Sequence, residues 1–552
     1  MKRLFCFILV VHGLETVRGA LTNVSLPFFL SGSNASLVRS NFFGISIELS
    51  IVDTIIGENT SSIPTQMENY LGYIQNRAQN PVRIRVGGNS MDDSVFNSTQ
   101  AKMIVYTGEA VSAHDQPVSY GPILYDVLVD LAKNIGGAEY LIGLSLLLRE
   151  ENDTPLTVST AQQKLTGYLD AFLLGNEPDL YGAHARRQSN YSVQDYFGEF
   201  TVVIQQLNNS KQYGDLLPQA YLGGPTICCN WALADILNQG YLTNFGSDLK
   251  YINLQHYPQN NCFGATVNVS YYTSHYNVVS LAKWQIDGVG TAKAADKPVL
   301  LGEFNTASCG GFPGISDTFA ATLWVIDYVL QLASVGYDGV YIHTRERGIT
   351  YNLFDPPASN DSSSNWTTLP TYYALLPIAE ALSPGWQNGS FVMDFQLNNN
   401  SESSLLAGYG IYDGQTSALT TMVFLNYADV GQDGAMFSLP SLGKNTIFTR
   451  TLTAASLSEK YNISWAGQTF LGVGDGKMVQ SGFAQDQQVS CDNTCDFIVP
   501  SPGAMVVWLD TSATSSPPTT SHGFSWRHAP SEMFLHLSFI SGLSWIISTY
   551  LF

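Results

Sequence analysis

The chain has 552 residues, too many for one small hydrophobic core, so we expect a large domain and a smaller one. It carries 45 Asp and Glu residues against 25 Lys and Arg residues. This acidic balance argues against a basic groove for nucleic acid or for highly sulfated polyanions, and it suits a soluble secreted protein.

The N-terminus has the pattern of a secretory signal peptide. Met1-Lys2-Arg3 is positively charged, the run from Leu4 to Val11 is apolar, and Gly19 is a small residue at a suitable cleavage point. Residues 1–19 are therefore predicted to be a signal peptide, and the protein to be secreted or at the cell surface. Thirteen Asn-x-Ser/Thr sequons fit N-glycosylation in a secretory pathway. They include Asn34, Asn97, Asn152, Asn268, Asn365 and Asn462.

Six cysteines remain after the signal peptide, an even number that suits disulfides in an oxidising compartment. Cys491 and Cys495 are expected to close a small loop. The other four follow predicted strands, which would gather them at one rim, and their spacing leaves the pairing open. They are Cys228, Cys229, Cys262 and Cys309. A metal site is a weaker alternative, since neither a CxxC pair nor clustered histidines accompany them.

Eight short β-like segments alternate with helical stretches, which predicts a closed (β/α)8 TIM barrel over residues 39–383. The predicted strands are 43–49, 82–86, 140–148, 171–174, 220–224, 251–256, 298–301 and 339–343. Apolar residues recur near a 3.6 period in the predicted helices, among them 121–135, 192–207, 231–245 and 316–335. A doubly wound open sheet is the alternative, but the Gly-rich phosphate loop of that fold is missing from the sequence.

The helical period disappears after about residue 384, and alternating segments between turns predict an antiparallel β-sandwich over residues 384–510. Its strands include 391–395, 404–411, 418–426 and 504–509. The N-terminal segment, residues 20–38, is also strand-like, and we expect it to add a strand to the sandwich. Residues 511–552 combine a Ser/Thr/Pro spacer with an apolar terminal run, a pattern typical of a GPI-attachment signal. A weakly structured tail is the alternative.

Two glutamates end apolar runs of the predicted barrel. Glu177 follows the fourth strand in Leu174-Gly175-Asn176-Glu177-Pro178, and Glu303 ends the seventh in Leu301-Gly302-Glu303-Phe304-Asn305. The carboxyl ends of barrel strands meet at one mouth, so the two side chains can face each other there. Cleavage of a glycosidic bond needs two carboxyl groups flanking that bond, and a separation of about 5 Å would indicate retention of configuration. The pair therefore predicts a glycosidase, although Asn176-Glu177-Pro178 alone could be a helix-entry turn.

Together with Arg85-Val86-Gly87-Gly88-Asn89-Ser90 at the second strand, these phrases resemble the clan A retaining glycosidases. Within that clan the chain is similar to glycoside hydrolase family 79, which contains β-glucuronidases and heparanases, over roughly residues 22–510. The resemblance implies that Glu177 is the acid/base and Glu303 the nucleophile. The chemistry agrees, because a glutamate that is protonated at pH 5 to 7 needs a raised pKa, which burial and an ionised neighbour supply.

The same resemblance implies substrate contacts around the two glutamates. Asn176 is expected to hydrogen-bond the sugar 2-hydroxyl, and Glu48 and Asn89 match positions that contact other hydroxyls of the glycone. Tyr257 is expected to donate to Glu303, with packing of its ring on the sugar as the alternative.

A sugar carboxylate would need further donors, and the loop after the eighth strand is the expected place for them. Gly348 and Tyr351 match the neighbourhood of the carboxylate site in the family. Arg345 or Arg347 could hold the carboxylate instead, but both are expected to be solvated or paired with Glu346. Arg83 and Arg85 are expected to be buried structural partners of barrel carboxylates.

These expectations describe a secreted retaining β-glucuronidase that removes terminal glucuronate, including its 4-O-methyl form, from a glycan. The alternatives are another clan A β-glycosidase, a cell-surface transglycosylase, and a non-catalytic surface protein that binds carbohydrate. The mechanism needs no cofactor, and the sequence carries no motif for a nucleotide, metal or flavin. The expected partners are the glycan substrate, N-glycans and a C-terminal lipid anchor in the membrane, and no nucleic acid.

Overall fold

The computed structural model of the chain describes residues 21–24, 36–108, 116–147, 153–358, 365–430, 434–440, 443–481 and 487–510. The expected signal peptide, spacer and GPI-attachment signal lie outside these residues. Within them, no helix is both long enough and apolar enough to cross a membrane.

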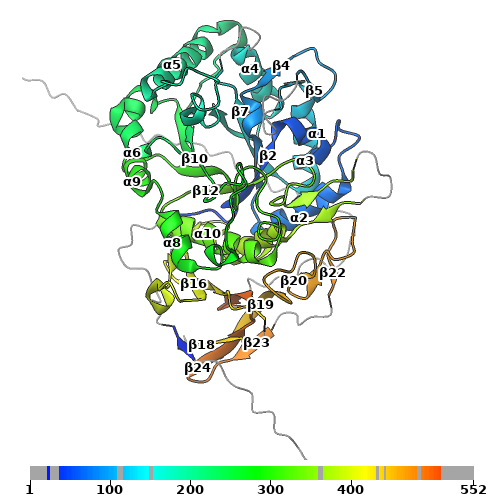
Figure 1. Ribbon diagram of the computed structural model, residues 1–552, viewed down its shortest axis with the longest axis vertical. Helices are drawn as coiled ribbons and strands as arrows, with labels where there is room; N and C mark the ends of the chain where they lie inside the picture. The colour runs from blue at the N-terminus through cyan, green and yellow to red at the C-terminus, as the bar shows by residue number, and fades with distance from the viewer. Residues whose placement is uncertain are drawn as a thin grey trace, which may run out of the picture. The chain divides into compact units, whose positions relative to one another are not determined.

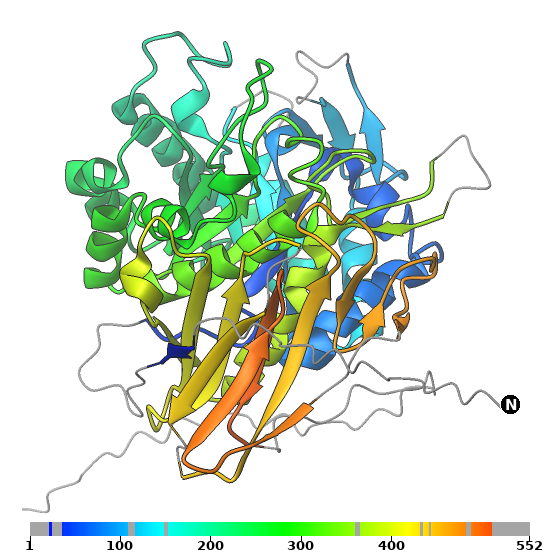
Figure 2. The same ribbon diagram turned by 60° about the horizontal axis from the view of Figure 1, so that its bottom comes forward.

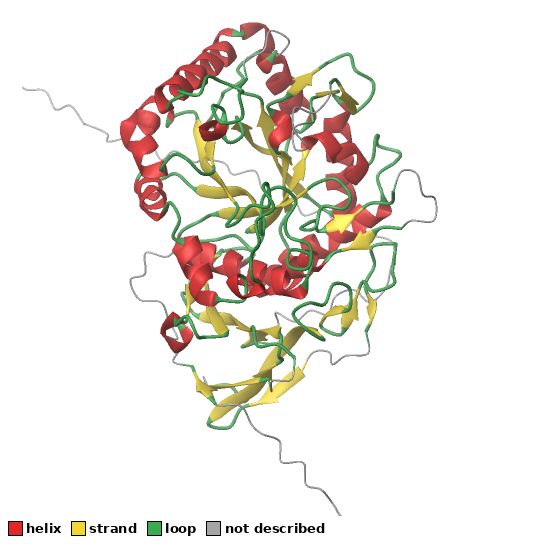
Figure 3. Cartoon of the chain, viewed as in Figure 1, coloured by secondary structure: helices red, strands yellow, loops and turns green. Residues whose placement is uncertain are grey.

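Eight parallel strands close into a barrel, which confirms the predicted fold class (Figures 1 and 3). Neighbouring strands follow the chain order, and the last strand pairs with the first. The strands are β2 (Phe43–Glu48), β3 (Val82–Gly87), β7 (Ala138–Leu144), β8 (Leu169–Leu174), β9 (Leu222–Ile227), β10 (Leu249–His256), β11 (Val299–Phe304) and β12 (Gly339–Thr344). They are almost entirely buried, as expected for a parallel sheet with one face against helices and the other in the barrel interior.

Helices cover the outside of the barrel (Figure 3). They are α1 (Val52–Ile56), α2 (Thr65–Ala78), α3 (Ile123–Ile135), α4 (Thr154–Lys164), α5 (Val193–Asn209), α6 (Leu233–Ile236), α7 (Leu242–Phe245), α8 (His275–Ala282), α9 (Ile286–Ala294), α10 (Phe319–Val335) and α11 (Leu375–Leu382). Ser192 and Asp195 form a capping box at the start of α5, and Gly336 ends α10 with a left-handed φ of 115°. The single helix predicted over 231–245 is wrong in detail. A π-helical segment with Gly240 at φ 110° separates α6 from α7.

Short elements lie in the connections of the barrel. A small sheet is formed by β4 (Ser94–Phe96), β5 (Ile104–Tyr106) and β6 (Val118–Tyr120), and a hairpin pair by β13 (Phe354–Asp355) and β14 (Thr367–Thr368). The 3-10 turns that matter for the site are η2 (Asn89–Met91), after β3, and η3 (Pro178–Leu180), after β8.

The C-terminal part contains two sheets, as the sequence predicted (Figure 2). The larger sheet consists of β15 (Ser390–Asp394), β16 (Leu406–Asp413), β17 (Leu419–Asn426), β25 (Gly503–Trp508), β19 (Thr446–Ala454), β20 (Ile463–Trp465), β21 (Gln468–Thr469) and β22 (Val479–Gln480), with β23 (Gln487–Ser490) also on β19. The smaller sheet consists of β1 (Thr22–Asn23), β18 (Ala435–Pro440) and β24 (Thr494–Val499). Aromatic rings pack between them, with centroids 4.7 Å apart for Phe424 and Phe437 and 5.3 Å apart for Phe424 and Phe497.

The N-terminal segment joins this second domain. Thr22 and Asn23 pair in parallel with Phe437 and Ser438 of β18. Farther along the segment, Val38 forms a β-bridge with Ser390 at the start of β15.

Three disulfides are present in the described residues. Cys491, just after β23, pairs with Cys495 of β24, as predicted. Cys262 pairs with Cys309, which joins the loop after β10 to the loop after β11. The third joins the adjacent residues Cys228 and Cys229, directly after β9.

A buried charge cluster ties the barrel to the second domain. His275, at the start of α8, lies 2.9 Å from an oxygen of Asp327 in α10 and 3.4 Å from Asp394 in β15. Tyr409 and Tyr427 donate hydrogen bonds to Asp327 from the larger sheet. Burial opposes protonation of His275, but the charges of Asp327 and Asp394 prevail and raise its pKa to about 10.

We expect His275→Gln to lower the free energy of unfolding by ~3–5 kcal/mol, because it leaves two buried carboxylates without their cation. The histidine pKa is raised in the folded state, so its contribution is complete below the ordinary pKa of 6.5 and is lost as the pH rises through about 10. Urea unfolding of wild type and variant at pH 6 and pH 10 measures both effects. Lys133→Gln, which breaks an exposed ion pair with Asp130, is the control and should cost under ~1 kcal/mol. Equal stability of wild type and His275→Gln at pH 6 would contradict this account.

Candidate active site

Glu177 lies in a tight turn at the carboxyl end of β8. Its backbone is left-handed, with φ 52°, and its N–H donates to the carbonyl of Thr226 at the end of β9 over 3.0 Å. A non-glycine residue in this region stores backbone strain, which persists only where the surroundings hold it. The side chain is partly exposed, so Glu177 is accessible at the mouth of the barrel.

Glu303 is a residue of β11 and is held by three donors or cations. Arg85 donates to its Oε2 over 2.5 Å, Tyr257 donates to its Oε1 over 2.8 Å, and His343 Nε2 lies 3.9 Å from Oε1. Burial opposes ionisation, but the charges of His343 and Arg85 prevail and lower the pKa of Glu303. Tyr257 thus makes the hydrogen bond to Glu303 that the sequence predicted.

The two glutamates have opposite pKa shifts. Burial, then the Glu303 charge and then the Asp179 charge raise the pKa of Glu177 well above its ordinary value. The pKa of Glu303 is lowered, as described above. Two carboxyl groups with pKa values driven apart by their surroundings are suited to act as a protonated acid and an ionised nucleophile.

Arg85 links Glu303 to Asn176, the residue next to Glu177. It is fully buried in β3, where it donates to Glu303, to Ser46 over 3.1 Å and to Asn176 Oδ1 over 2.8 Å. The glycine that follows makes room for it, since a Cβ on Gly87 would lie 2.6 Å from Arg85 Nε. Arg85 is therefore a buried partner of a barrel carboxylate, as predicted, and that carboxylate is Glu303.

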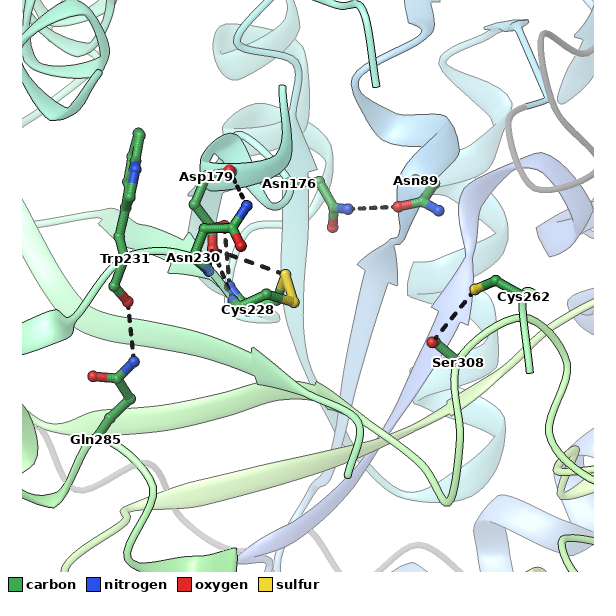
Figure 4. Close-up of a disulfide and its surroundings, with 10 residues drawn as sticks. Asn89, Asn176, Asp179, Cys228, Asn230, Trp231, Cys262, Gln285 and Ser308 are labelled. Atoms are coloured by element: carbon green, nitrogen blue, oxygen red, sulfur yellow. Dashed lines mark hydrogen bonds between the residues drawn. A yellow bond between two sulfur atoms is a disulfide. The ribbon is translucent and has the colours of Figure 1, made fainter. Parts of the chain in front are cut away.

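Asn176 sits beside Glu177 in a dense amide network. Its side chain donates to Asn89 Oδ1 over 2.9 Å, which Figure 4 shows, and its backbone N–H donates to Asp92 over 3.0 Å. The amide of Gln255, from β10, lies 2.7 Å from Asn176 Oδ1 and 3.1 Å from Glu177 Oε1. Asn176 and Asn89 thus lie together beside Glu177.

Glu48 ends β2 and is buried beside the same site. Ser90 donates to it from its backbone N–H over 2.8 Å, and His343 Nε2 lies 3.3 Å from its Oε2. Burial opposes ionisation, but the hydrogen bond from His343 and the charge of Arg345 lower the pKa of Glu48 to about 2. Gly88, at φ 81°, has no side chain to collide with this carboxylate, since its Cβ would lie 2.2 Å from Glu48 Oε2.

The loop after β12 differs from the expectation for a carboxylate site. Gly348 is exposed, and its N–H already donates to Asp355 over 3.0 Å. Tyr351 is buried, with its ring 6.2 Å from that of Tyr257, so it does lie beside the site. Arg345 is paired with Glu346, as one of the two expectations had it, but it is buried and not solvated. It is 4% exposed, and its Nε lies 3.0 Å from Glu346 and 4.0 Å from Glu48.

Arg347 differs from Arg345. It is exposed and donates to the carbonyl of Pro356. Arg345 is therefore the arginine of this loop that comes nearest to the site.

The chain is similar to known glycoside hydrolases. A model of the glycosyl hydrolase family 79 C-terminal beta domain matches residues 408–506, within the second domain. A β-glucuronidase of Neurospora crassa is 24% identical over 401 residues, which are 67% of this chain and 70% of that protein. A β-glucuronidase of Aspergillus niger is 24% identical over 424 residues, 70% of this chain and 75% of that protein. The chain is thus similar to these fungal β-glucuronidases, and its second domain matches the family 79 C-terminal domain.

Solved structures support the fold of the chain. A 4-O-α-L-rhamnosyl-β-D-glucuronidase from Fusarium oxysporum 12S has a TM-score of 0.72 at 22% identity and covers 88% of this chain and 100% of that one. A family 51 arabinofuranosidase from Xanthomonas axonopodis pv. citri has a TM-score of 0.56 at 12% identity and covers 89% and 99%. At these identities the likeness concerns the fold.

The sequence did not indicate several polar groups of the candidate site. His343 contacts both Glu48 and Glu303, Gln255 lies between Glu177 and Asn176, and Asp92 accepts from the Asn176 backbone. His343 and Gln255 are the next-to-last residues of β12 and β10, and Asp92 follows η2 after β3; these positions near strand ends were the available signal. A polar residue at the carboxyl end of a buried barrel strand has few roles other than the site.

We expect Arg85→Lys to lower kcat/KM by about 100-fold, because a lysine cannot reach Glu303 and Asn176 with two parallel donors. Weaker charge stabilisation should also raise the Glu303 pKa and move the acidic limb of the pH profile to higher pH. The matched control is Arg83→Lys, two residues earlier in β3, where the arginine pairs with Glu139 and Asp170 away from the site. That variant should lose stability and keep its pH profile. An unchanged acidic limb in Arg85→Lys would contradict the role of Arg85.

Proposed function

We propose that this glycoside hydrolase is a retaining β-glucuronidase that removes terminal glucuronate, including its 4-O-methyl form, from glycans. The observation that carries the proposal is the pair of barrel-mouth glutamates with opposite pKa shifts, Glu177 raised and Glu303 lowered. The β-glucuronidases among its family relatives support the choice of sugar.

In the first step Glu303 attacks the anomeric carbon while Glu177 gives its proton to the leaving oxygen. The hydrogen bonds from Arg85 and Tyr257 keep Glu303 ionised and fix its two oxygens before attack. The sugar is then esterified to Glu303, and the aglycone leaves as an alcohol.

In the second step Glu177 acts as the base. Once Glu303 is an ester its negative charge is gone, so a major cause of the raised Glu177 pKa is removed and Glu177 stays ionised. It takes a proton from water, the water oxygen attacks the anomeric carbon, and Glu303 leaves as the carboxylate. Two inversions give net retention.

The glucuronate carboxylate is bound by two groups of the loop after β12, the guanidinium of Arg345 and the hydroxyl of Tyr351. The Gly348 N–H is engaged by Asp355, and Arg347 by Pro356. Arg345 is buried beside Glu48 and Tyr351, so a substrate carboxylate near it would meet a desolvated positive charge. Glu48, Asn89 and Asn176 remain for the sugar hydroxyls.

The pH dependence of kcat/KM should be bell-shaped. The lowered pKa of Glu303 sets the acidic limb below the ordinary value of 4.5, and the raised pKa of Glu177 sets the basic limb above it. Activity therefore falls at low pH as Glu303 is protonated, and at high pH as Glu177 loses its proton. Glu177→Gln should remove the basic limb in a profile measured with an activated aryl glycoside. A basic limb that persists in this variant would contradict the assignment.

The proposal includes the location of the enzyme. The signal-like N-terminus, the sequons, the even number of cysteines and the GPI-like C-terminus support a secreted or cell-surface glycoprotein with a lipid anchor. Glycopeptide mass spectrometry and release from cells by a phosphatidylinositol phospholipase would test the glycans and the anchor separately.

The proposed function is tested by hydrolysis of matched aryl β-D-glucuronide, β-glucoside and β-xyloside substrates, using secreted protein without its terminal signals. Cleavage selective for the glucuronide is the expected result. Selective cleavage of a neutral glycoside would replace the sugar and keep the mechanism. Failure to cleave any of the three would count against a β-glucuronidase and in favour of a transglycosylase or a binding protein.

A further inference from the structure

The turn that carries Glu177 is fastened to the end of the neighbouring strand. The Asp179 carboxylate accepts the backbone N–H groups of Cys228 over 3.1 Å, Cys229 over 2.7 Å and Asn230 over 2.7 Å. The Asn230 side chain returns a hydrogen bond to the Asp179 carbonyl over 3.1 Å. We call Asp179, Cys228, Cys229 and Asn230 the β8–β9 clamp; Figure 4 shows Asp179 beside Cys228 and Asn230, with its hydrogen bonds dashed.

The clamp joins two segments whose backbones are both strained. Glu177 has φ 52° and Thr226 has φ 58°, and the two are hydrogen-bonded directly to each other. Side chains other than glycine, and β-branched ones above all, adopt such angles only where the surroundings enforce them. Asp179 lies two residues after the acid, and the disulfide begins two residues after Thr226, so the clamp closes immediately beyond the strained pair.

We infer that the β8–β9 clamp is a positioning device for Glu177, in which the disulfide between Cys228 and Cys229 fixes the turn that holds Asp179 and thereby the acid. Three N–H groups can converge on one carboxylate only if the turn at residues 228–230 has one shape, and the disulfide restricts that shape. Asp179 is 7% exposed and Cys228 is buried, whereas Cys229 is exposed. The inference rests on the proposed role of Glu177.

Electrostatics give the clamp a distinct signature. The groups whose charges act on Glu177 are Glu303 and Asp179, which raise its pKa, and Arg186 and Arg85, which lower it. Removing the Asp179 charge should therefore lower the Glu177 pKa and move the basic limb of the pH profile to lower pH. A residue that only stabilises the fold would leave that limb in place.

The test compares the Cys228→Ser/Cys229→Ser double variant with Cys262→Ser/Cys309→Ser, which removes the disulfide between the loops after β10 and β11. Substrates are glycosides of one sugar with an activated aryl or a poor alkyl leaving group, and kcat/KM is measured for each. The clamp variant should lose about 10- to 100-fold on the alkyl glycoside and under about 3-fold on the aryl one, because only the former depends on the acid. The control should show no such difference between the two substrates.

Asp179→Asn keeps the volume of the side chain, and it tests the clamp if the double cysteine variant does not fold. It should show the same preference for the activated substrate and a basic limb at lower pH. Equal losses on both substrates with an unmoved basic limb would overturn the clamp. The ratio of kcat/KM on the aryl glycoside to kcat/KM on the alkyl glycoside is measured with a sugar that the wild type cleaves. If the proposed sugar is wrong, the wild type itself will fail to cleave glucuronides. The comparison between wild type and clamp variants on another sugar still tests the clamp.

Discussion

Replacing Glu303 with Gln is expected to lower kcat by roughly 10⁴-fold or more while the protein stays folded. The amide is nearly isosteric with the carboxylate, but it cannot form the glycosyl ester. It also loses the charge that Arg85 and His343 stabilise and that keeps Glu177 protonated. Aryl β-D-glucuronide turnover and the unfolding temperature, measured on the same preparation, would show the loss of activity without loss of structure.

The control is Glu68→Gln, which changes a surface glutamate of α2 that accepts a hydrogen bond from Asn134. It should keep wild-type turnover. Normal turnover in Glu303→Gln would exclude Glu303 as the nucleophile, and unfolding of that variant would show up as a lowered melting temperature.

Glu177→Ala should distinguish leaving groups. We expect kcat/KM to fall by roughly 10²- to 10⁴-fold for alkyl or glycan leaving groups, which need a proton, and far less for a dinitrophenyl leaving group, which does not. The second step should then become limiting on the activated substrate, because water has lost its base. Added azide, which attacks without a base, should restore turnover there and give the β-glycosyl azide.

Azide rescue should be absent in Glu303→Gln, in which no glycosyl ester forms. Equal losses of Glu177→Ala on both classes of leaving group, with no effect of azide, would remove Glu177 from the acid/base role.

Much of the barrel could be predicted because its strands are nearly continuous apolar runs separated by amphipathic helices. Strand 43–48 was predicted over 43–49, and strand 339–344 over 339–343. Strand β9 was predicted over 220–224 but lies at Leu222–Ile227, because Gly223, Gly224 and Pro225 read as a strand end in sequence. The structure pairs these residues with β10, which no local pattern reveals.

The positions of the two glutamates at strand ends could be predicted, because the sequence locates the ends of β8 and β11 to within a few residues. The polar contacts around the two glutamates could not be predicted from the sequence. The Arg85 contact with Glu303 spans 218 positions of sequence, and the contact of His343 with Glu48 spans 295. Side chains brought together by barrel closure leave no mark on local periodicity. The pairing of adjacent Cys228 and Cys229 was equally open, since four cysteines at one rim allow three connectivities.

The central claim is that Glu303 forms a covalent bond to glucuronate, and the most direct measurement is labelling with a glucuronate-configured cyclophellitol-type inhibitor followed by peptide mass spectrometry. The result we predict is one label per chain, on Glu303, blocked by free glucuronate, the product, and absent from Glu303→Gln. A label on another residue, or an unlabelled protein that still binds the glycan, would contradict the account.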